Sequence, residues 1–526
     1  MAEDYKPGTV PLEEQDNRKL FCKYHYKGVL VILIPLVLAP MFLAQPILVF
    51  RFLYLTFCFY LYYILNVIAR GASAFIYITL IPICGIESSK PLSITYYGDL
   101  IFLVYACVIM GCAMDTSKVS DRLAIDMLKL CSGSIKRIQI FLTLFVLFTS
   151  AMVNPTLAAA FGMKVAQAAL VELDKGGVIK LYSEEKPYEV GAKPYPTLPA
   201  VGVFLSCGYA AALGGMMSPF VNPNGVTADN YKGLDILGLV MITAGPALIG
   251  VIAMIVWIQC IFFGMLGGKV KTELQEGSAN RPAFNQALVE KKAALGSWNS
   301  HAKLTYGLIL CLFILVGSRQ PNLWNGWDKW IGGVGCGLSV PAVFVAILFF
   351  AVAANFLFCR YYICREPEKS GTAPSLVGWK SVNTNCPWAD IFMLGGAVSG
   401  IVCGVPSTYY ATVVTALKTD KGGPFLHSLY GALYGTLLTS LGPGTTVAQF
   451  ALPIVLKAGH TFALPFATSL NNSFLLPTSS PANTIVSGWG NVRPYLFLIG
   501  GIVPSIVTFL AVFGTTCILQ SSVLKK

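Results

Sequence analysis

Two short stretches interrupt long apolar segments of this chain in a similar way. Residues 152–161 read MVNPTLAAAF and residues 441–450 read LGPGTTVAQF, so each places a proline beside small polar residues. A helix that breaks inside a bilayer leaves backbone N–H and C=O groups unpaired, and these persist only where protein buries them or where they line a polar cavity. In a membrane protein the two breaks therefore predict the tips of two re-entrant hairpins around a common polar site.

The composition is that of a membrane protein. Of the 526 residues, 55% are hydrophobic and only 12% are charged, whereas a soluble protein typically carries about 25% charged residues. Apolar runs such as 28–44, 138–153 and 238–267 approach or exceed the length of about 20 residues that a crossing helix needs. We predict an all-α polytopic membrane protein with roughly eleven transmembrane helices plus the two re-entrant hairpins.

The remaining composition excludes several classes of protein. The net charge of +12 is typical of positive-inside loops and of contact with membrane lipid, and it also favours an anionic substrate. The 15 cysteines lie mostly within apolar spans and form no disulfide or metal-ligand pattern. Because no nucleophile–base pair and no basic-aromatic stripe is present, we expect neither an enzyme nor a nucleic-acid partner.

The two halves of the chain resemble each other. The stretch DLIFLVYACVIMG from Asp99 is similar to DIFMLGGAVSGIVCG from Asp390, and each is followed by one of the breaks at nearly the same spacing. Further on, NPN at 222–224 is matched by PAN at 481–483. Interrupted segments at corresponding places are typical of transporters built from inverted repeats.

The chain divides accordingly. Its polar N-terminal stretch lacks the apolar region and the cleavage site of a signal peptide, so we expect the first apolar span to act as its own insertion signal. The charged stretch between the repeats predicts a cytoplasmic linker, most simply a solvated one. The predicted parts are a cytoplasmic tail (1–26), a first inverted repeat (27–267) with a hairpin near 138–170, the linker (268–303), and a second inverted repeat (304–526) with a hairpin near 428–460.

The breaks suggest what the site binds. Half-helix N-termini present N–H groups and a partial positive charge to an anion. Freed carbonyls, hydroxyls and amide oxygens suit a small cation such as Na⁺. Ser and Thr within membrane helices often only bond back to a carbonyl, but four residues lie at paired breaks and are the favoured candidates: Asn154, Asn224, Thr445 and Asn483.

Charged residues within the apolar segments are few. Asp99 and Asp390 begin segments and are expected near an interface, so proton coupling has no obvious carrier. Lys164 and Lys457 follow the two tips at roughly equivalent places. They either attract an anion or extend to the membrane interface, and the second interpretation is the simpler one.

Over nearly its whole length the chain resembles the divalent anion:sodium symporters, which include the I'm-not-dead-yet, citrate and dicarboxylate transporters. The resemblance is carried by NNSFLLPTSSPANTIVSGWG (471–490), FALPIVLKAGH (450–460), PWADIFMLGGAVSG (387–400) and ALGGMMSPFVNPNGV (212–226). It implies a homodimer in which each protomer has a scaffold domain and a transport domain with two hairpins. It also implies elevator-type movement of the transport domain and carriage of di- or tricarboxylates, with Na⁺ as the coupling ion or by exchange.

The resemblance also assigns residues. The family's Ser-Asn-Thr motif at each tip corresponds here to Asn154-Pro155-Thr156 and Pro443-Gly444-Thr445, so only the Thr remains in either copy. The substrate-binding residues it implies are Asn154, Thr156, Gly444, Thr445, Ser480 and Pro481. The Na⁺-binding residues it implies are Ser150, Asn154, Asn224, Thr439 and Asn483.

The altered tips leave alternatives open. A hydrogen bond to a charged group contributes about 1.5–3 kcal/mol, so the loss of two amide donors would lower affinity by roughly two to four decades unless other donors replace them. There are two alternatives. The protein is a carrier of another anion such as sulfate, or it is a transport-incompetent relative that acts as a receptor or scaffold. With no transit or retrieval signal, we expect a multi-pass protein of the plasma membrane.

Overall fold

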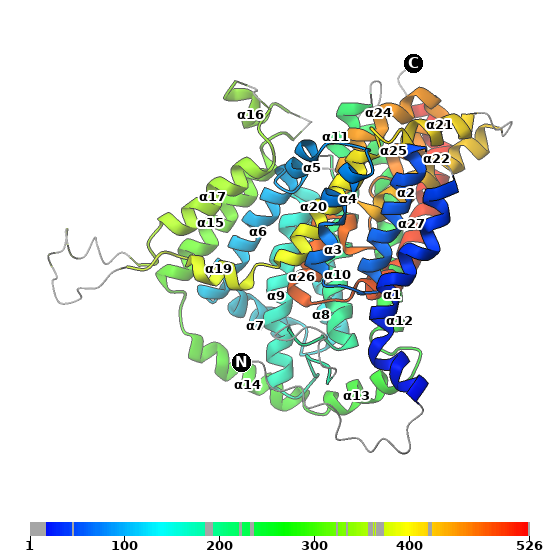
Figure 1. Ribbon diagram of the computed structural model, residues 1–526. Helices are drawn as coiled ribbons and strands as arrows, with labels where there is room; N and C mark the ends of the chain where they lie inside the picture. The colour runs from blue at the N-terminus through cyan, green and yellow to red at the C-terminus, as the bar shows by residue number, and fades with distance from the viewer. Residues whose placement is uncertain are drawn as a thin grey trace.

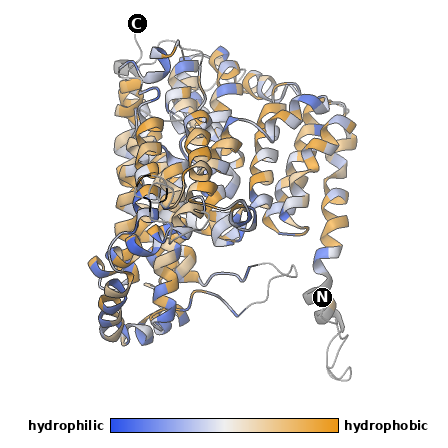
Figure 2. Ribbon diagram, turned by 90° about the vertical axis from the view of Figure 1, so that its left-hand side faces the viewer, coloured by the Kyte–Doolittle hydropathy of each residue, from blue (hydrophilic) through white to orange (hydrophobic). Residues whose placement is uncertain are grey.

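The protein is all-helical and its apolar helices form one upright bundle. The computed structural model describes residues 17–44, 47–184, 193–219, 224–231, 236–321, 324–332, 335–355, 361, 363, 365, 373–418 and 423–523. Over these residues the only strand-like pairings are two isolated bridges. Figure 1 shows upright helices, and Figure 2 shows that they are mainly apolar, with hydrophilic residues gathered toward their two ends. The predicted all-α polytopic class is confirmed.

The helices of the first half run to the end of α12. They are α1 (Asn17–Ala44), α2 (Leu48–Ile64), α3 (Arg70–Ala74), α4 (Ile76–Ile83), α5 (Ser89–Thr95), α6 (Asp99–Thr116), α7 (Val119–Leu130), α8 (Ile135–Met152), α9 (Pro155–Lys175), α10 (Leu198–Met216), α11 (Asn224–Asn230) and α12 (Ile236–Ile261). Two helices follow in the segment between the halves, α13 (Lys269–Ser278) and α14 (Arg281–Leu295).

The second half begins with α15. Its helices are α15 (Ser300–Gly317), α16 (Trp327–Trp330), α17 (Ser339–Ala351), α19 (Trp379–Asn385), α20 (Trp388–Cys403), α21 (Tyr409–Lys418), α22 (Pro424–Leu441), α23 (Gly444–Phe450), α24 (Leu452–Val455), η2 (Leu456–Ala458), α25 (His460–Ser469), η3 (Pro477–Ser479), α26 (Pro481–Gly490) and α27 (Pro494–Val523).

Fewer helices than expected are long enough to cross a membrane. Among the described residues eight helices pass on length and composition, or nine if the bent pair of α19 and α20 counts as one span. Three further apolar stretches are shorter: α2, α3 with α4, and α17. The difference from roughly eleven arises because these three apolar stretches are too short to count as full spans. The two long arms of the first predicted hairpin, α8 and α9, are among the eight.

The inner and outer helices differ in burial. In α10 94% of the apolar window is buried within the protein, and in α9 83% is buried. For α15 the share is 28%, and for α1 it is 6%. Helices that are apolar all round and buried form the centre, whereas α1 and α15 present apolar residues outward, as lipid-facing helices do.

Elements follow the same order in both halves around the two breaks. In the first half α8 packs against α10, and in the second α22 packs against α25. Glycines allow both approaches: a Cβ on Gly214 would lie 2.7 Å from the Ser150 Cβ, and one on Gly435 would meet the Ser469 hydroxyl. Across the halves, α9 contacts α26 and α11 contacts α23. This arrangement is what the predicted inverted repeats require, and the repeat boundaries stay a prediction.

The segment between the halves is docked instead of being a simple solvated linker. The Phe284 ring packs so closely against Gly133 and Gly176 that a Cβ at Gly176 would collide with it. The Asn280 amide donates to the Gly177 carbonyl at 2.9 Å. Lys291 forms an ion pair with Glu172 of α9. In Figure 1 α13 and α14 lie across the lower end of the bundle, so they cover the base of α8 and α9.

Candidate functional site

Three helix N-termini meet at one cavity in the centre of the protein. The three N-cap residues are Asn154 before α9, Pro443 before α23 and Ser480 before α26. The N-cap and the first two residues of each helix line the cavity. The full lining is Leu100, Leu103, Asn154, Pro155, Thr156, Ala212, Leu338, Pro443, Gly444, Thr445, Leu470, Asn471, Ser473, Ser479, Ser480, Pro481 and Ala482. All six residues predicted to bind substrate are therefore brought together here.

The first tip is closed by its own side chain. Asn154 has extended backbone angles, and its Oδ1 accepts from the N–H of Thr156 at 2.8 Å and of Leu157 at 3.4 Å. Pro155 at the first helical position has no N–H to satisfy. Because Oδ1 is used by the cap, the Nδ2 group of Asn154 is the part of this amide that is left to donate to a ligand.

The second tip is closed by backbone packing instead. Pro443 is the N-cap of α23 and makes no side-chain cap bond. Gly444 lies against the carbonyl of Leu470, where an added Cβ would collide. The Thr445 hydroxyl is buried and has no hydrogen-bond partner within the described structure. An unsatisfied hydroxyl at a helix N-terminus is well placed to donate to an anion.

The third N-terminus belongs to the break before α26. The Ser480 hydroxyl accepts from the N–H of Asn483 at 3.1 Å, which caps the helix. The Thr484 hydroxyl lies 3.0 Å from the Pro477 carbonyl, which closes the preceding turn. This half-helix starts at the cavity and packs along α9, so the two helices point their N-terminal ends at the same space.

The cavity is small and carries no formal charge. Its volume is about 50 Å³, which is enough for about three to five water molecules at about 10–15 Å³ each. None of its lining residues is ionisable, and one wall is made by Leu100, Leu103 and Leu338. Apart from Thr445, the buried Oδ1 of Asn471 also has no partner in the described part of the chain. Neutral donors and helix ends therefore set the electrostatics.

Two of the residues predicted to bind cations lie beside the first tip. Ser150, on α8, donates to the Ala211 carbonyl of α10 at 2.6 Å. Asn224 is fully buried, and its Nδ2 lies 3.1 Å from the Met216 carbonyl and 3.0 Å from the Ser218 carbonyl, so it holds the free C-terminal end of α10. Its Oδ1 accepts from Asn471 Nδ2 at 2.8 Å, a bridge between the two halves.

The other two lie beside the second tip. Thr439 donates back to the Gly435 carbonyl at 3.0 Å and lies 3.4 Å from the Asn472 carbonyl. Asn483 donates to the Ser473 carbonyl at 2.8 Å, and its buried Oδ1 has no partner among the described residues. Ser150, Asn224, Thr439 and Asn483 thus organise carbonyls around the cavity without lining it. Neutral oxygens of this kind are the ligands that Na⁺ takes.

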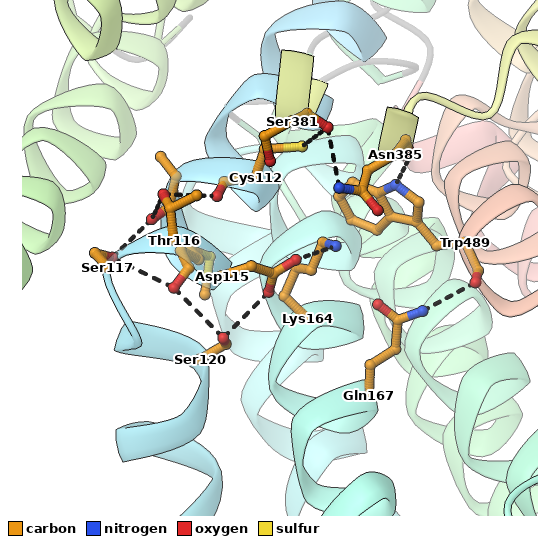
Figure 3. Close-up of polar contacts among 12 residues, drawn as sticks. Cys112, Asp115, Thr116, Ser117, Ser120, Lys164, Gln167, Ser381, Asn385 and Trp489 are labelled. Atoms are coloured by element: carbon orange, nitrogen blue, oxygen red, sulfur yellow. Dashed lines mark hydrogen bonds and ion pairs between the residues drawn. The ribbon is translucent and has the colours of Figure 1, made fainter. Parts of the chain in front are cut away.

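The far ends of α9 and α26 carry a second, charged cavity of about 310 Å³. Lys164 is 5% exposed, and its Nζ lies 2.7 Å from Asp115 Oδ2 and 4.2 Å from the centre of the Trp489 ring (Figure 3). Gln167 donates to the Trp489 carbonyl at 2.9 Å. Desolvation, and then the Lys164 ammonium, lower the pKa of Lys193 at this cavity. Lys164 is therefore buried and paired, and the expectation that it extends to the interface was wrong.

The two aspartates that begin corresponding helices have different surroundings. Asp99 is exposed and accepts from the backbone N–H of Ser339 at 3.1 Å. Asp390 is only 6% exposed, lies 3.4 Å from Arg70 and accepts from the Ser487 hydroxyl at 2.8 Å. Asp390 is thus buried within the protein beside a cation from α3, a partner that the sequence pattern did not connect to it. Its expected place near an interface stays a prediction.

Sequence reasoning missed part of the lining. Asn471, Ser473 and Ser479 stand out in the sequence as polar residues beside the break before α26, although no binding role was predicted for them. Leu100, Leu103 and Leu338 carried no signal, because an apolar residue in a membrane helix does not reveal which neighbour it faces. Asn222 and Pro223 of the first NPN break lie outside the described residues.

Comparison with known proteins supplies an independent finding. Residues 60–457 match the family described as Citrate transporter. The chain is 25% identical to "Protein I'm not dead yet" of Drosophila melanogaster over 523 residues, covering 94% of this chain and 88% of that protein. It is 23% identical to the Na(+)/citrate cotransporter of Mus musculus over 544 residues, covering 94% of each chain. It is also 23% identical to the sodium-dependent high-affinity dicarboxylate transporter 3 of Caenorhabditis elegans, over 84% of this chain and 78% of that protein.

Proposed function

The chain belongs to the Citrate transporter family, and from that premise we propose that it carries di- or tricarboxylate anions across a membrane, coupled to Na⁺ or by exchange. The family and its relatives are transporters, so the cavity binds a passenger instead of catalysing a reaction. We place this multi-pass protein in the plasma membrane, as a homodimer.

One observation carries the proposal: three helix N-termini surround an uncharged cavity whose polar groups include two without a partner among the described residues. Backbone N–H groups at helix N-termini bind carboxylates without a buried arginine. The Thr156 and Thr445 side chains and the Asn154 amide supply further donors. Carboxylates are proposed to lie between Asn154-Pro155-Thr156 and Pro443-Gly444-Thr445, with Ser480 and Pro481 on the third side.

Na⁺ is proposed to bind on either side of this position. At the first tip the oxygens come from Ser150 and from the carbonyls at the end of α10. Asn154 and Asn224 contribute when their Oδ1 atoms give up the hydrogen bonds that they accept in this structure. At the second they come from Thr439 and Asn483, whose Oδ1 is buried without a partner in the described structure. A cation there would neutralise part of the charge of a bound carboxylate, which couples the two binding events.

Movement is proposed to be of the elevator type. The helices of the two tips and their neighbours, α8 to α12 and α22 to α27, pack on one another across the two halves. Such a body can move as one unit past the remaining helices and carry the cavity with it. α6 and the start of α17 supply the remaining wall of the cavity.

Labelled citrate and succinate uptake into proteoliposomes tests the proposal, with and without an inward Na⁺ gradient. Saturable uptake that rises with the gradient supports coupling, and uptake stimulated only by internal anion supports exchange. Saturable uptake of labelled sulfate, with no citrate or succinate uptake, would assign the site to another anion. Folded protein that binds and moves none of them would leave a receptor or scaffold role.

A further inference from the structure

A third cavity lies between the start of α8, the residues after α12 and the docked α13–α14 segment, and its lining is positively charged. This basal cavity has a volume of about 430 Å³. It is lined by the start of α8, by the residues that follow α12, by one face of α13 and by the first residue of α14. Three of the lining residues are cationic and none is acidic, so the lining has an excess of three positive charges that nothing in it neutralises.

The three cations come from three different elements and converge on one space. Lys136 lies in the first turn of α8, Lys271 lies on α13, and Arg281 begins α14. None of them makes an ion pair within the described residues. The Arg281 Nε is buried and has no hydrogen-bond partner there. A buried guanidinium N–H without an acceptor costs stability unless a ligand supplies one.

The helix α13 turns one side toward this cavity and carries its acidic residues on the other side. On α13, Lys271, Leu274, Gln275 and Ser278 recur at helical spacing and line the cavity. Glu273, Glu276 and Lys269 fall on the opposite side of the same helix. The acids of α13 are therefore turned away, and Lys269 provides a matched cation outside the cavity.

The N-terminus of α8 adds backbone donors. Ser134 is its N-cap and makes no side-chain cap bond, and both Ser134 and Ile135 line the cavity. The first N–H groups of an uncapped 18-residue helix are free to bind an anion. Phosphate, with several acceptor oxygens, matches an arginine, two lysines and helix N–H groups better than a single carboxylate does.

The position of the cavity identifies the source of that phosphate. α8 begins and α12 ends at this cavity, and both helices are apolar enough to cross a membrane. Their common end lies where hydrocarbon gives way to headgroups. Beside it Met265 is 51% exposed and Leu266 is 78% exposed, an apolar fringe suited to acyl chains. We propose that the basal cavity binds the phosphate of an anionic phospholipid headgroup, and so ties the docked α13–α14 segment to the membrane.

The test compares two triple variants with the same change in charge. K136Q/K271Q/R281Q removes the three cavity cations, and R137Q/K269Q/K303Q removes three exposed cations that do not line it. Full-length protein in neutral detergent is titrated with phosphatidylglycerol or phosphatidylcholine. We then measure the thermal midpoint of unfolding, and we measure the lipid that the protein retains by native mass spectrometry. The cavity variant is expected to bind phosphatidylglycerol about tenfold or more weakly, because it loses at least one charge-assisted contact. The control variant is expected to match the wild type.

Three outcomes would overturn the proposal. The first is that the wild type retains phosphatidylcholine as well as phosphatidylglycerol, and the second is that both triple variants lose phosphatidylglycerol to the same extent. The third is that inorganic phosphate alone stabilises the protein as much as phosphatidylglycerol does, which would make the site one for a free anion. The single variant R281Q, expected to weaken phosphatidylglycerol binding in the same direction, guards against a triple variant that fails to fold. The readout is lipid binding, so it is independent of whether the carboxylate proposal holds.

Discussion

The two hairpin tips present helix ends to the same cavity but are held in different ways. At the first tip the side chain of Asn154 caps α9, a helix of 21 residues. At the second, the N-cap is Pro443, the next residue is Gly444, and α23 has seven residues before the chain bends into α24. The first tip is thus stabilised within itself, whereas the second depends on its neighbours. Substitutions at matched positions should therefore have unequal effects.

The largest difference is expected for Gly444→Ala against Pro155→Ala. A Cβ at Gly444 would collide with the Leu470 carbonyl, and overpacking of this kind costs about 1–3 kcal/mol or more. Uptake by Gly444→Ala should fall below detection with a lowered thermal midpoint, while Pro155→Ala retains transport. Equal activity of the two variants would show that the second tip is no more tightly packed than the first.

The next largest is expected for Thr445→Val against Thr156→Val. The Thr445 hydroxyl has no internal partner in the described structure, so its removal should leave the thermal midpoint unchanged. Its donor contributes about 1.5–3 kcal/mol to a carboxylate, which corresponds to a rise in KM of roughly 10- to 150-fold. Thr156→Val should raise KM less, because the Asn154 amide remains at that tip. The measurement is the KM for uptake at varied substrate concentration. A normal KM in both variants would show that these two hydroxyls do not bind the substrate.

A third comparison uses the lysines that follow the tips, Lys164→Met against Lys457→Met. Lys164 is buried beside Asp115 and Trp489, and Gly111 leaves room for it, since a Cβ there would lie 2.8 Å from the Lys164 Cε. Its loss should cost about 1–3 kcal/mol, less than a fully buried pair, because the Asp115 side chain is 43% exposed. Lys457 is exposed, so its change should stay within about 0.5 kcal/mol. Thermal midpoints in detergent measure both.

The smallest difference is expected for Asn154→Ala against Pro443→Ala. Loss of an N-cap costs about 0.5–2 kcal/mol, and Pro443 makes no cap bond to lose. The stability effect is therefore confined to the first tip. Asn154→Ser, which keeps a cap acceptor but removes the amide donor, should restore the thermal midpoint but not the KM. If serine restores both, the amide does not contact the substrate.

The sequence predicted the breaks better than it predicted their surroundings. A proline among small polar residues in an apolar segment is a local signal, and Asn154, Thr156, Gly444, Thr445, Ser480 and Pro481 all reach one cavity. The roles of these six residues and of the Na⁺ candidates stay predictions. The Asp390–Arg70 pair and the burial of Lys164 depend on which helices pack together. That packing is set by contacts such as Gly111 against Trp489, which hydropathy does not encode.

The same reasoning explains the segment between the halves. Its charged composition indicated a solvated stretch, yet two aromatic and aliphatic residues, Phe284 and Leu288, are 5% and 2% exposed. Two buried side chains among many charges give a weak pattern in the sequence. Their effect appears only once Gly133 and Gly176 form the surface that receives Phe284.

That docking decides where this polypeptide can be divided into two fragments. A cut near Gly268 would remove Phe284 from Gly133 and Gly176 and uncover the base of the first hairpin. A cut near Asn299 leaves α13 and α14 on the first fragment, with Arg122 still donating to the Leu295 and Gly296 carbonyls. Co-expressed halves should therefore reassemble from the second cut and not from the first, so the natural seam of the chain lies after α14.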